Sequence, residues 1–240
     1  MHPSVHAKSN PDKPAYIMAY SGETVTYGEL DARSNQGAQL FRSLGLKTGD
    51  AVAFFIDNHP RYYELIWAAQ RSGLRYTCLS SKLTVGEVEY IVKDCEAKVF
   101  VASMATAETA LAVAPLIPGV ALYMVGGVAG PYQSLEEARA AMPTTPVADE
   151  SAGRPMLYSS GTTGRPKGVK RIAPEGAVDN SIEAANPLGT LGAALYGWTP
   201  DSIYLSPAPL YHAAPLGWSC AVQAMGGTVI LMERLTPRTR

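Results

Sequence analysis

The chain alternates short apolar runs with longer segments in which apolar residues recur every three to four positions. A continuous apolar run such as residues 51–56 is expected of a strand covered on both faces, whereas the longer spacing indicates amphipathic helices. This pattern predicts strands at residues 15–20, 24–25, 51–56, 76–79, 98–101, 120–125, 169–172, 201–205 and 228–232. It predicts helices at residues 26–44, 60–72, 84–94, 105–114, 135–141, 175–196 and 215–225, of which 175–196 is interrupted by a proline and a glycine.

Two helix starts carry an explicit capping signal. Thr26 with Glu29, and Thr84 with Glu87, have the spacing of a capping box, in which the hydroxyl and the carboxylate each accept a free backbone N–H of the first turn. Asn58 is expected to cap the helix at 60–72. Buried strands that alternate with capped helices are typical of βαβ units. The predicted fold class is therefore α/β, with a largely parallel sheet and flanking helices.

Composition narrows the class of protein. The 240 residues are 47% hydrophobic and 17% charged, which is enough for one sizeable core or two small ones. A net charge of −1 gives no electrostatic basis for nucleic-acid binding. The three cysteines are widely spaced and form no metal-ligand pattern with the four histidines, so reduced thiols are expected. Because the N-terminus also lacks an apolar signal-peptide core, we expect a cytoplasmic protein.

Two long stretches without charge, residues 109–135 and 202–232, raise the question of a membrane span. Prolines and glycines interrupt both of them repeatedly, whereas a spanning helix needs about 20 largely unbroken apolar residues. We therefore expect buried α/β elements there and no transmembrane segment.

Residues 156–169 (MLYSSGTTGRPKGV) hold the strongest chemical signal in the chain. The glycines allow backbone N–H groups to converge on an anion, the hydroxyls can bind phosphate oxygens or a hard cation, and the lysine adds a positive charge. Polyphosphate with a metal ion is the expected ligand. The residues that would form this cradle are Ser159, Ser160, Gly161, Thr162, Thr163, Gly164, Lys167 and Gly168.

Two other interpretations of this segment are an ordinary surface turn and a P-loop. Gly, Ser, Thr and Pro are also the ordinary residues of a surface turn, although their order here is more specific than composition alone. A P-loop of the NTPase type would need a lysine followed by Ser or Thr and then a helix. Here Pro166 precedes Lys167, Gly168 follows it, and the next residues favour a strand.

The segment resembles the phosphate loop of the adenylate-forming enzymes, the superfamily of acyl-CoA synthetases, luciferases and peptide-synthetase adenylation domains. That motif is usually written Tyr-Thr-Ser-Gly-Thr-Thr-Gly-x-Pro-Lys-Gly, and the one departure is Ser159 in place of threonine, which keeps the hydroxyl. A second run, residues 209–212 (PLYH), is similar to the family's next core motif, which lines the acyl pocket. It follows the strand predicted at 201–205, at the sheet edge where open α/β proteins bind ligands.

The resemblance implies an acid–thiol ligase that uses ATP, Mg²⁺ and coenzyme A. A carboxylic acid, most simply a fatty acid, attacks the α-phosphate of ATP, pyrophosphate leaves, and a thiol then takes the acyl group. By carry-over, the residues of the cradle hold the triphosphate, Lys167 and His212 are the catalytic candidates, and Thr162 is the candidate metal ligand. A lone histidine after a proline-rich turn is more often structural, so motif order is what favours a role for His212.

The resemblance covers essentially the whole chain but only the first part of the family's large domain. The family's later acid for Mg²⁺, ribose-binding aspartate, hinge and C-terminal lysine have no counterpart before residue 240. Residues 1–240 are thus expected to be an incomplete N-terminal adenylation domain with little ligase activity alone, and a separate chain carrying the remaining part is one conceivable partner. A non-catalytic nucleotide- or partner-binding remnant and, with less support, a P-loop NTPase stay open as alternatives.

Overall fold

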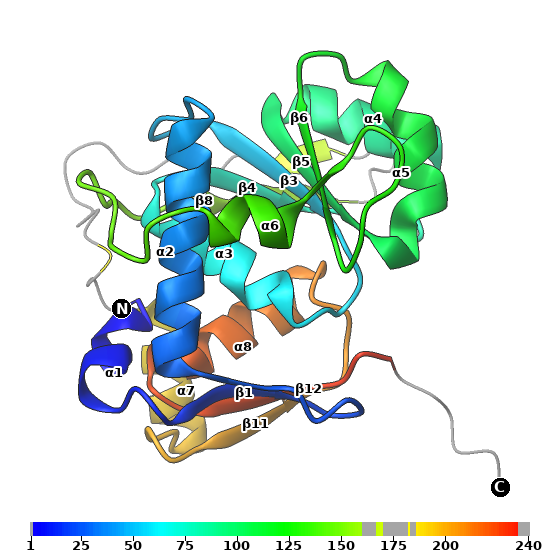
Figure 1. Cartoon of the computed structure of the whole chain (residues 1–240). Helices are drawn as coiled ribbons and strands as arrows, with labels where there is room; N and C mark the ends of the chain where they lie inside the picture. Colours follow the sequence, from blue (N-terminus) through cyan, green and yellow to red (C-terminus); the bar gives the residue numbers. More distant parts are fainter. Residues whose placement is uncertain (1, 160–166, 170–181, 183–185, 235–240) are drawn as a thin grey trace, which may run out of the picture.

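A computed structural model describes residues 2–159, 167–169, 182 and 186–234. Its larger sheet has six strands in the order β7 (Gln133–Ser134), β6 (Ala121–Val125), β5 (Ala97–Ser103), β3 (Ala51–Phe55), β4 (Arg75–Cys78) and β8 (Arg154–Pro155). All five neighbouring pairs are parallel. The parallel α/β architecture expected from the sequence is confirmed, and Figure 1 shows this sheet in the upper half of the molecule.

A second sheet of four strands lies in the lower half of Figure 1. Its order is β11 (Ile203–Ser206), β12 (Thr228–Leu231), β1 (Pro14–Met18) and β2 (Thr24–Thr26). The first three strands are mutually parallel, and β1 with β2 forms an antiparallel hairpin. The strands were thus predicted, but their division into two sheets was not, because the pairing of β1 with β12 joins residues more than 200 positions apart.

Helices fill the space between the sheets and cover the outer face of the larger one. In Figure 1, α2 (Tyr27–Ser43) runs down the left side and α3 (Arg61–Arg71) and α8 (Ala213–Ala224) lie in the middle, whereas α4 (Val85–Asp94) and α5 (Ala107–Val113) lie at the upper right. The other helices in the described part of the chain are α1 (Ser4–Ser9), α6 (Leu135–Ala140), α7 (Pro187–Tyr196) and two 3₁₀ turns, Met104–Thr106 and Ala114–Leu116.

Strand β3 shows why a continuous apolar run was expected. Val52 and Phe54 belong to the core between the two sheets, whereas Ala53 and Phe55 belong to the core under α4 and α5. Since neighbouring side chains of a strand point to opposite faces, burial on both faces requires every position to be apolar. The two uncharged stretches are likewise accounted for by α5 with β6, and by β11, α8 and β12. No helix in the described part of the chain is long and apolar enough to cross a membrane.

Both predicted capping boxes are confirmed. The N–H of Glu29 donates to Thr26 Oγ1 at 3.2 Å and the N–H of Thr26 donates to Glu29 Oε2 at 2.9 Å. Thr84 and Glu87 repeat the arrangement at the start of α4. The expectation that Asn58 caps α3 is wrong: the N-cap of α3 is Pro60, and no side chain caps it.

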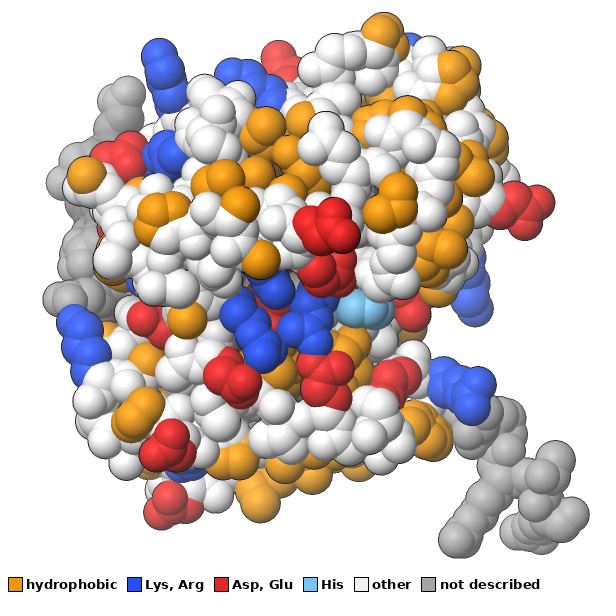
Figure 2. All heavy atoms as spheres, in the orientation of Figure 1, with side chains coloured by type: hydrophobic (Ala, Val, Ile, Leu, Met, Phe, Trp, Pro, Cys, Tyr) orange, Lys and Arg blue, Asp and Glu red, His pale blue; other side chains and the backbone are white. Residues whose placement is uncertain are grey.

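A buried ion cluster joins helices α2, α3 and α6 to strand β1. The carboxylate of Glu64, which is 1% exposed, accepts from Arg33 at 3.0 Å, from Arg61 at 2.8 Å and from Arg139. It also accepts the hydroxyl of Tyr16 at 3.2 Å. Figure 2 shows basic side chains gathered with acidic ones at the centre of this face, where the two halves of the molecule meet. The cluster ties the two sheets together through charge as well as apolar packing.

Candidate functional site

The signature segment begins and ends as two paired strands. Strand β9 (Leu157–Ser159) and strand β10 (Lys167–Val169) run antiparallel, with Ser159 opposite Lys167. The strand predicted at 169–172 therefore starts two residues earlier, and its later residues fall outside the described part. The predicted ligands Ser160, Gly161, Thr162, Thr163 and Gly164 also lie outside the described residues, as do the side chains of Ser159 and Lys167. Their roles remain predictions.

Two contacts link the start of this hairpin to helix α4 and to the six-stranded sheet. The hydroxyl of Tyr158 donates to Asp94 Oδ2 at the end of α4, at 2.5 Å. Burial, and after it this hydrogen bond, raises the pKa of Tyr158, so the phenol stays protonated and remains a donor. Beside it, the N–H of Met156 donates to the carbonyl of Tyr76 in β4 at 2.9 Å. The base of the predicted phosphate loop is thereby held against the larger sheet.

Gly168 packs closely against both anchoring side chains. A Cβ at this position would lie 2.6 Å from Met156 Cε and 3.0 Å from Tyr158 Cζ. A side chain at position 168 would therefore force the ends of Met156 and Tyr158 to move, whatever the backbone amide of this residue binds. From the sequence, Gly168 was expected only to bind the ligand, so its packing against Met156 and Tyr158 was not predicted.

His212 lies at the start of α8, after strand β11, which ends at Ser206. It occupies the N-cap position with extended backbone angles, its carbonyl accepts the N–H of Leu216 at 3.2 Å, and its side chain makes no capping bond. The imidazole is exposed and lies against the ring of Tyr211, with 4.4 Å between ring centroids. The segment thus follows the carboxyl end of a parallel strand as expected, and the imidazole is open to a ligand.

Asn58 holds the loop that carries His212. This role was not predicted from the sequence. Its side-chain N–H groups donate to the carbonyls of Met232 at 2.7 Å and Ala208 at 3.3 Å. Its side-chain oxygen accepts the N–H of Leu210 at 2.9 Å. An asparagine two residues after a strand gives a local signal for a helix cap, and nothing local points to partners 150 or more positions away.

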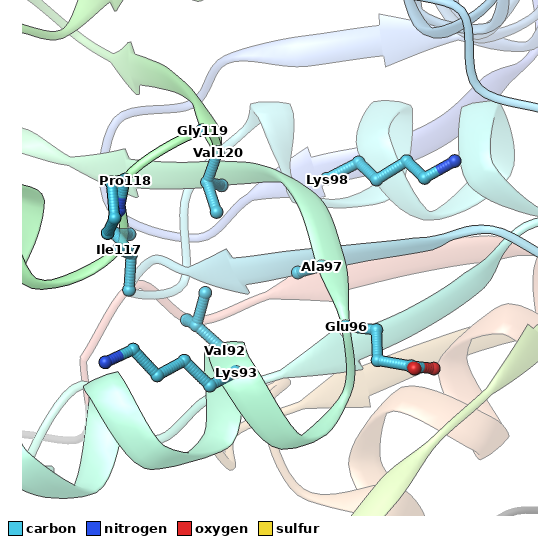
Figure 3. A pocket seen from close by; sticks show the side chains of 9 residues that line it. All are labelled: Val92, Lys93, Glu96, Ala97, Lys98, Ile117, Pro118, Gly119 and Val120. Carbon is cyan, nitrogen blue, oxygen red and sulfur yellow. The ribbon is translucent and has the colours of Figure 1, made fainter.

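A cleft of about 360 Å³ elsewhere on the described surface lies at the starting ends of β5 and β6 (Figure 3). Its charged side chains already have partners: Lys93 pairs with Glu89, Lys98 with Asp50 and Glu96 with Arg75. In Figure 3 the two lysines point in opposite directions rather than toward a common anion. The described residues hold no cluster of three His, Cys, Asp or Glu side chains that could bind a metal ion.

Comparison with known proteins identifies the family. The sequence pattern of the family described as "AMP-binding enzyme" matches residues 4–240. The chain belongs to this family. The match includes the β9–β10 segment and the loop of His212, which are the two places where the resemblance was first recognised.

The curated relatives include proteins named as ligases and CoA synthases. Feruloyl-CoA synthase of an Amycolatopsis species is 33% identical over 224 residues, which are 93% of this chain and 42% of that protein. The long-chain-fatty-acid–CoA ligase FadD13 of Mycobacterium tuberculosis is 27% identical over 237 residues, which are 95% of this chain and 44% of that protein. The chain therefore spans less than half the length of these relatives.

Solved structures agree on the fold. A fatty acyl CoA synthetase of Mycobacterium tuberculosis superimposes with a TM-score of 0.80 at 23% identity. The superposition covers 98% of this chain and 44% of the synthetase chain. ATP-bound MatB of Rhodopseudomonas palustris gives a TM-score of 0.73 at 26% identity and covers 99% of this chain and 46% of that one. The chain therefore shares its fold with these two structures.

Proposed function

We propose that this chain supplies the phosphate-binding part of an ATP-dependent acid–thiol ligase. A substrate carboxylate attacks the α-phosphate of ATP, and the bond to the leaving pyrophosphate breaks. The thiol of coenzyme A, losing its proton, then attacks the acyl carbon of the acyl-adenylate, and AMP leaves. The observation that carries the proposal is the signature segment, whose two ends form an anchored hairpin within the stretch matched by the AMP-binding family.

The proposed cradle for the triphosphate consists of the residues named from the sequence: Ser159, Ser160, Gly161, Thr162, Thr163, Gly164, Lys167 and Gly168. This donor set suits the ligand, because amides, hydroxyls and an ammonium group are what phosphate oxygens accept. Such groups lower the barrier by stabilising the charge that develops on the departing pyrophosphate. Thr162 offers a hard oxygen ligand to Mg²⁺, which when bound would neutralise part of the same charge.

His212 is proposed to border the carboxylate of the acid. Its imidazole is exposed at the carboxyl end of β11, which is where ligands of open α/β sheets bind. Coenzyme A is the proposed thiol, because a feruloyl-CoA synthase and the CoA ligase FadD13 are among the relatives. A fatty acid is the first candidate for the acid. Ferulate and proline are the acids to compare with it, since the relatives include feruloyl-CoA synthase and an L-proline–[L-prolyl-carrier protein] ligase of Streptomyces coelicolor.

We further propose that the domain is completed by more polypeptide, in the same chain or in a separate one. Large apolar side chains are exposed on edge strand β11, where Ile203 is 70% and Leu205 is 54% exposed. Helix α7 adds Leu195 and Tyr196, at 63% and 64%. An uncharged apolar surface beside an edge strand is typical of a face that packs against further structure. The cytoplasm is the proposed location, supported by three free cysteines, which suit a reducing compartment.

The test is acyl-CoA formation from ATP, coenzyme A and a panel of acids: dodecanoate, ferulate and proline. We expect residues 1–240 alone to turn over far more slowly than full-length FadD13, because groups that complete the reaction lie in the additional polypeptide. Rates near those of the full-length relative would contradict the need for further polypeptide. Failure of the purified chain to bind Mg·ATP would contradict the ligase assignment itself.

A further inference from the structure

The two halves of the proposed site belong to different sheets. The hairpin that carries the phosphate loop is attached to the six-stranded sheet, because Met156 bonds to Tyr76 in β4 and β4 is paired with β3. The loop that carries His212 instead connects β11 to α8, and β11 is an edge of the four-stranded sheet. Some contact must therefore set the position of His212 relative to the phosphate loop.

Asn58 makes such a contact. It follows β3, the central strand to which β4 is paired, so its backbone is part of the six-stranded half. Its side chain reaches the four-stranded half at the Ala208 and Leu210 backbone and at Met232, just after β12. Leu210 is fully buried and Asn58 is 8% exposed, so water does not easily replace these bonds.

The amide is the functional group that this position needs. The three partners are two carbonyl oxygens, which require donors, and one N–H, which requires an acceptor. An asparagine side chain offers two N–H donors and one carbonyl oxygen, whereas an aspartate of the same size offers only acceptors and a leucine offers neither. All three bonds end on backbone atoms, so they fix the course of the chain rather than one side chain.

We propose that Asn58 is a positioning residue: it sets the register of the His212 loop, and with it the acid-binding half of the site, against the phosphate-binding half. This inference rests on the proposed function for the role of His212 and extends it to a residue that touches neither ligand. His212 lies two positions beyond Leu210, and its own N–H donates back to the carbonyl of Pro209 at 3.2 Å. A shift of Leu210 is therefore passed directly to the imidazole.

The experiment compares wild type, Asn58→Ala and Asn58→Asp with the control Asn35→Ala. Asn35 is an equally buried asparagine, 1% exposed, whose amide bonds to Asp31 within helix α2, away from the loop. Three quantities are measured for each protein: the NMR signals of the His212 ring, the Kd of Mg·ATP, and the Kd of dodecanoyl-sulfamoyl-adenosine, a stable analogue of an acyl-adenylate.

We expect both Asn58 variants to shift the His212 signals and to leave the affinity for ATP unchanged. Their affinity for the analogue should fall by about 10- to 100-fold, because displacing a group of the site by about 1 Å has an effect of this size. Asn58→Asp should restore neither the His212 signals nor the affinity for the analogue, since aspartate keeps the size of the side chain but lacks its N–H donors. Asn35→Ala should lower stability without moving the His212 signals or the affinity for the analogue.

Three results would overturn the inference. They are unchanged His212 signals in Asn58→Ala, equal changes in Asn35→Ala, or loss of the folded state in both Asn58 variants while Asn35→Ala stays folded. The last would show that Asn58 supports the fold as a whole. If the wild type fails to bind ATP and the analogue, the proposed function fails, yet the His212 signals still report whether Asn58 positions the loop.

Discussion

Replacing Glu64 by glutamine tests the buried ion cluster that ties the two sheets together. Glu64 Oε1 accepts from Tyr16, Arg33 and Arg61, and Oε2 accepts from Arg139. A glutamine keeps one oxygen acceptor and the volume of the side chain but replaces the other oxygen with an NH₂ group. The amide then presents a donor either to Arg139 or to the other three groups, and the carboxylate charge is lost in every case.

The size of the effect follows from burial. The Glu64 side chain is 1% exposed and that of Arg139 is 9% exposed, so solvent screens this pair little. Removing one member of a buried pair leaves the other charge uncompensated and costs about 3–5 kcal/mol. Such a loss would be a large part of the roughly 5–15 kcal/mol by which typical domains are stable. The two arginines with second partners, Arg33 with Glu29 and Arg61 with Glu23, should limit the damage to this range.

Urea unfolding followed by circular dichroism measures the loss, with Glu89→Gln as the matched control. Glu89 pairs with Lys93 one turn along α4, and their side chains are 30% and 55% exposed. An exposed pair of this kind contributes about 0.3–0.5 kcal/mol. We expect a large drop in the urea midpoint for Glu64→Gln and almost none for Glu89→Gln. Equal, small drops in both variants would refute the view that Glu64 holds the sheets together.

Three further predictions follow from the site and the core. Gly168→Val should destabilise the β9–β10 hairpin and weaken the binding of Mg·ATP, because its Cβ would collide with Met156 and Tyr158. The control Gly86→Ala, whose Cβ would have nothing within 4 Å, should instead stabilise α4 by about 0.5–1 kcal/mol. Urea unfolding measures the stability of both variants, and calorimetry measures their affinity for Mg·ATP. Tyr158→Phe should speed amide exchange in β9 and β10 by freeing them from Asp94, and unchanged exchange would count against that anchor. Burial raises the pKa of the Cys95 thiol from 9.0 to about 11. The free energy of unfolding should therefore be unaffected by this thiol below pH 9 and should fall as the pH rises toward 11. Cys95→Ala should lessen this fall, and the same pH profile in wild type and variant would contradict the prediction.

Local signals in the sequence predicted much of the fold. The capping boxes at Thr26 and Thr84 were readable because both partners lie three residues apart and serve the same helix start. The apolar run of β3 was readable because burial on both faces leaves no room for alternation. Short pieces such as α1, β7 and β8 were missed, since they have too few residues to show a period and depend on tertiary contacts. His6 of α1, for instance, bonds to the carbonyl of Ala224.

Contacts over long sequence separations could not be predicted in this way. Asn58 looks like a helix cap because it precedes Pro60, yet its partners lie 150 to 174 positions further along the chain. Gly168 was singled out for what its amide could bind, while its packing against Tyr158 appears only when β9 and β10 are paired. The candidate ligands of the phosphate were therefore named from order and spacing, and the residues that support them became visible only in the folded chain.

Calorimetric titration of Mg·ATP into wild type and Lys167→Ala tests the phosphate cradle most directly. We predict measurable binding by the wild type and markedly weaker binding by the variant, with both proteins showing the same urea midpoint. Equal affinity in the two proteins would contradict the assignment of residues 159–168 as the nucleotide-phosphate site.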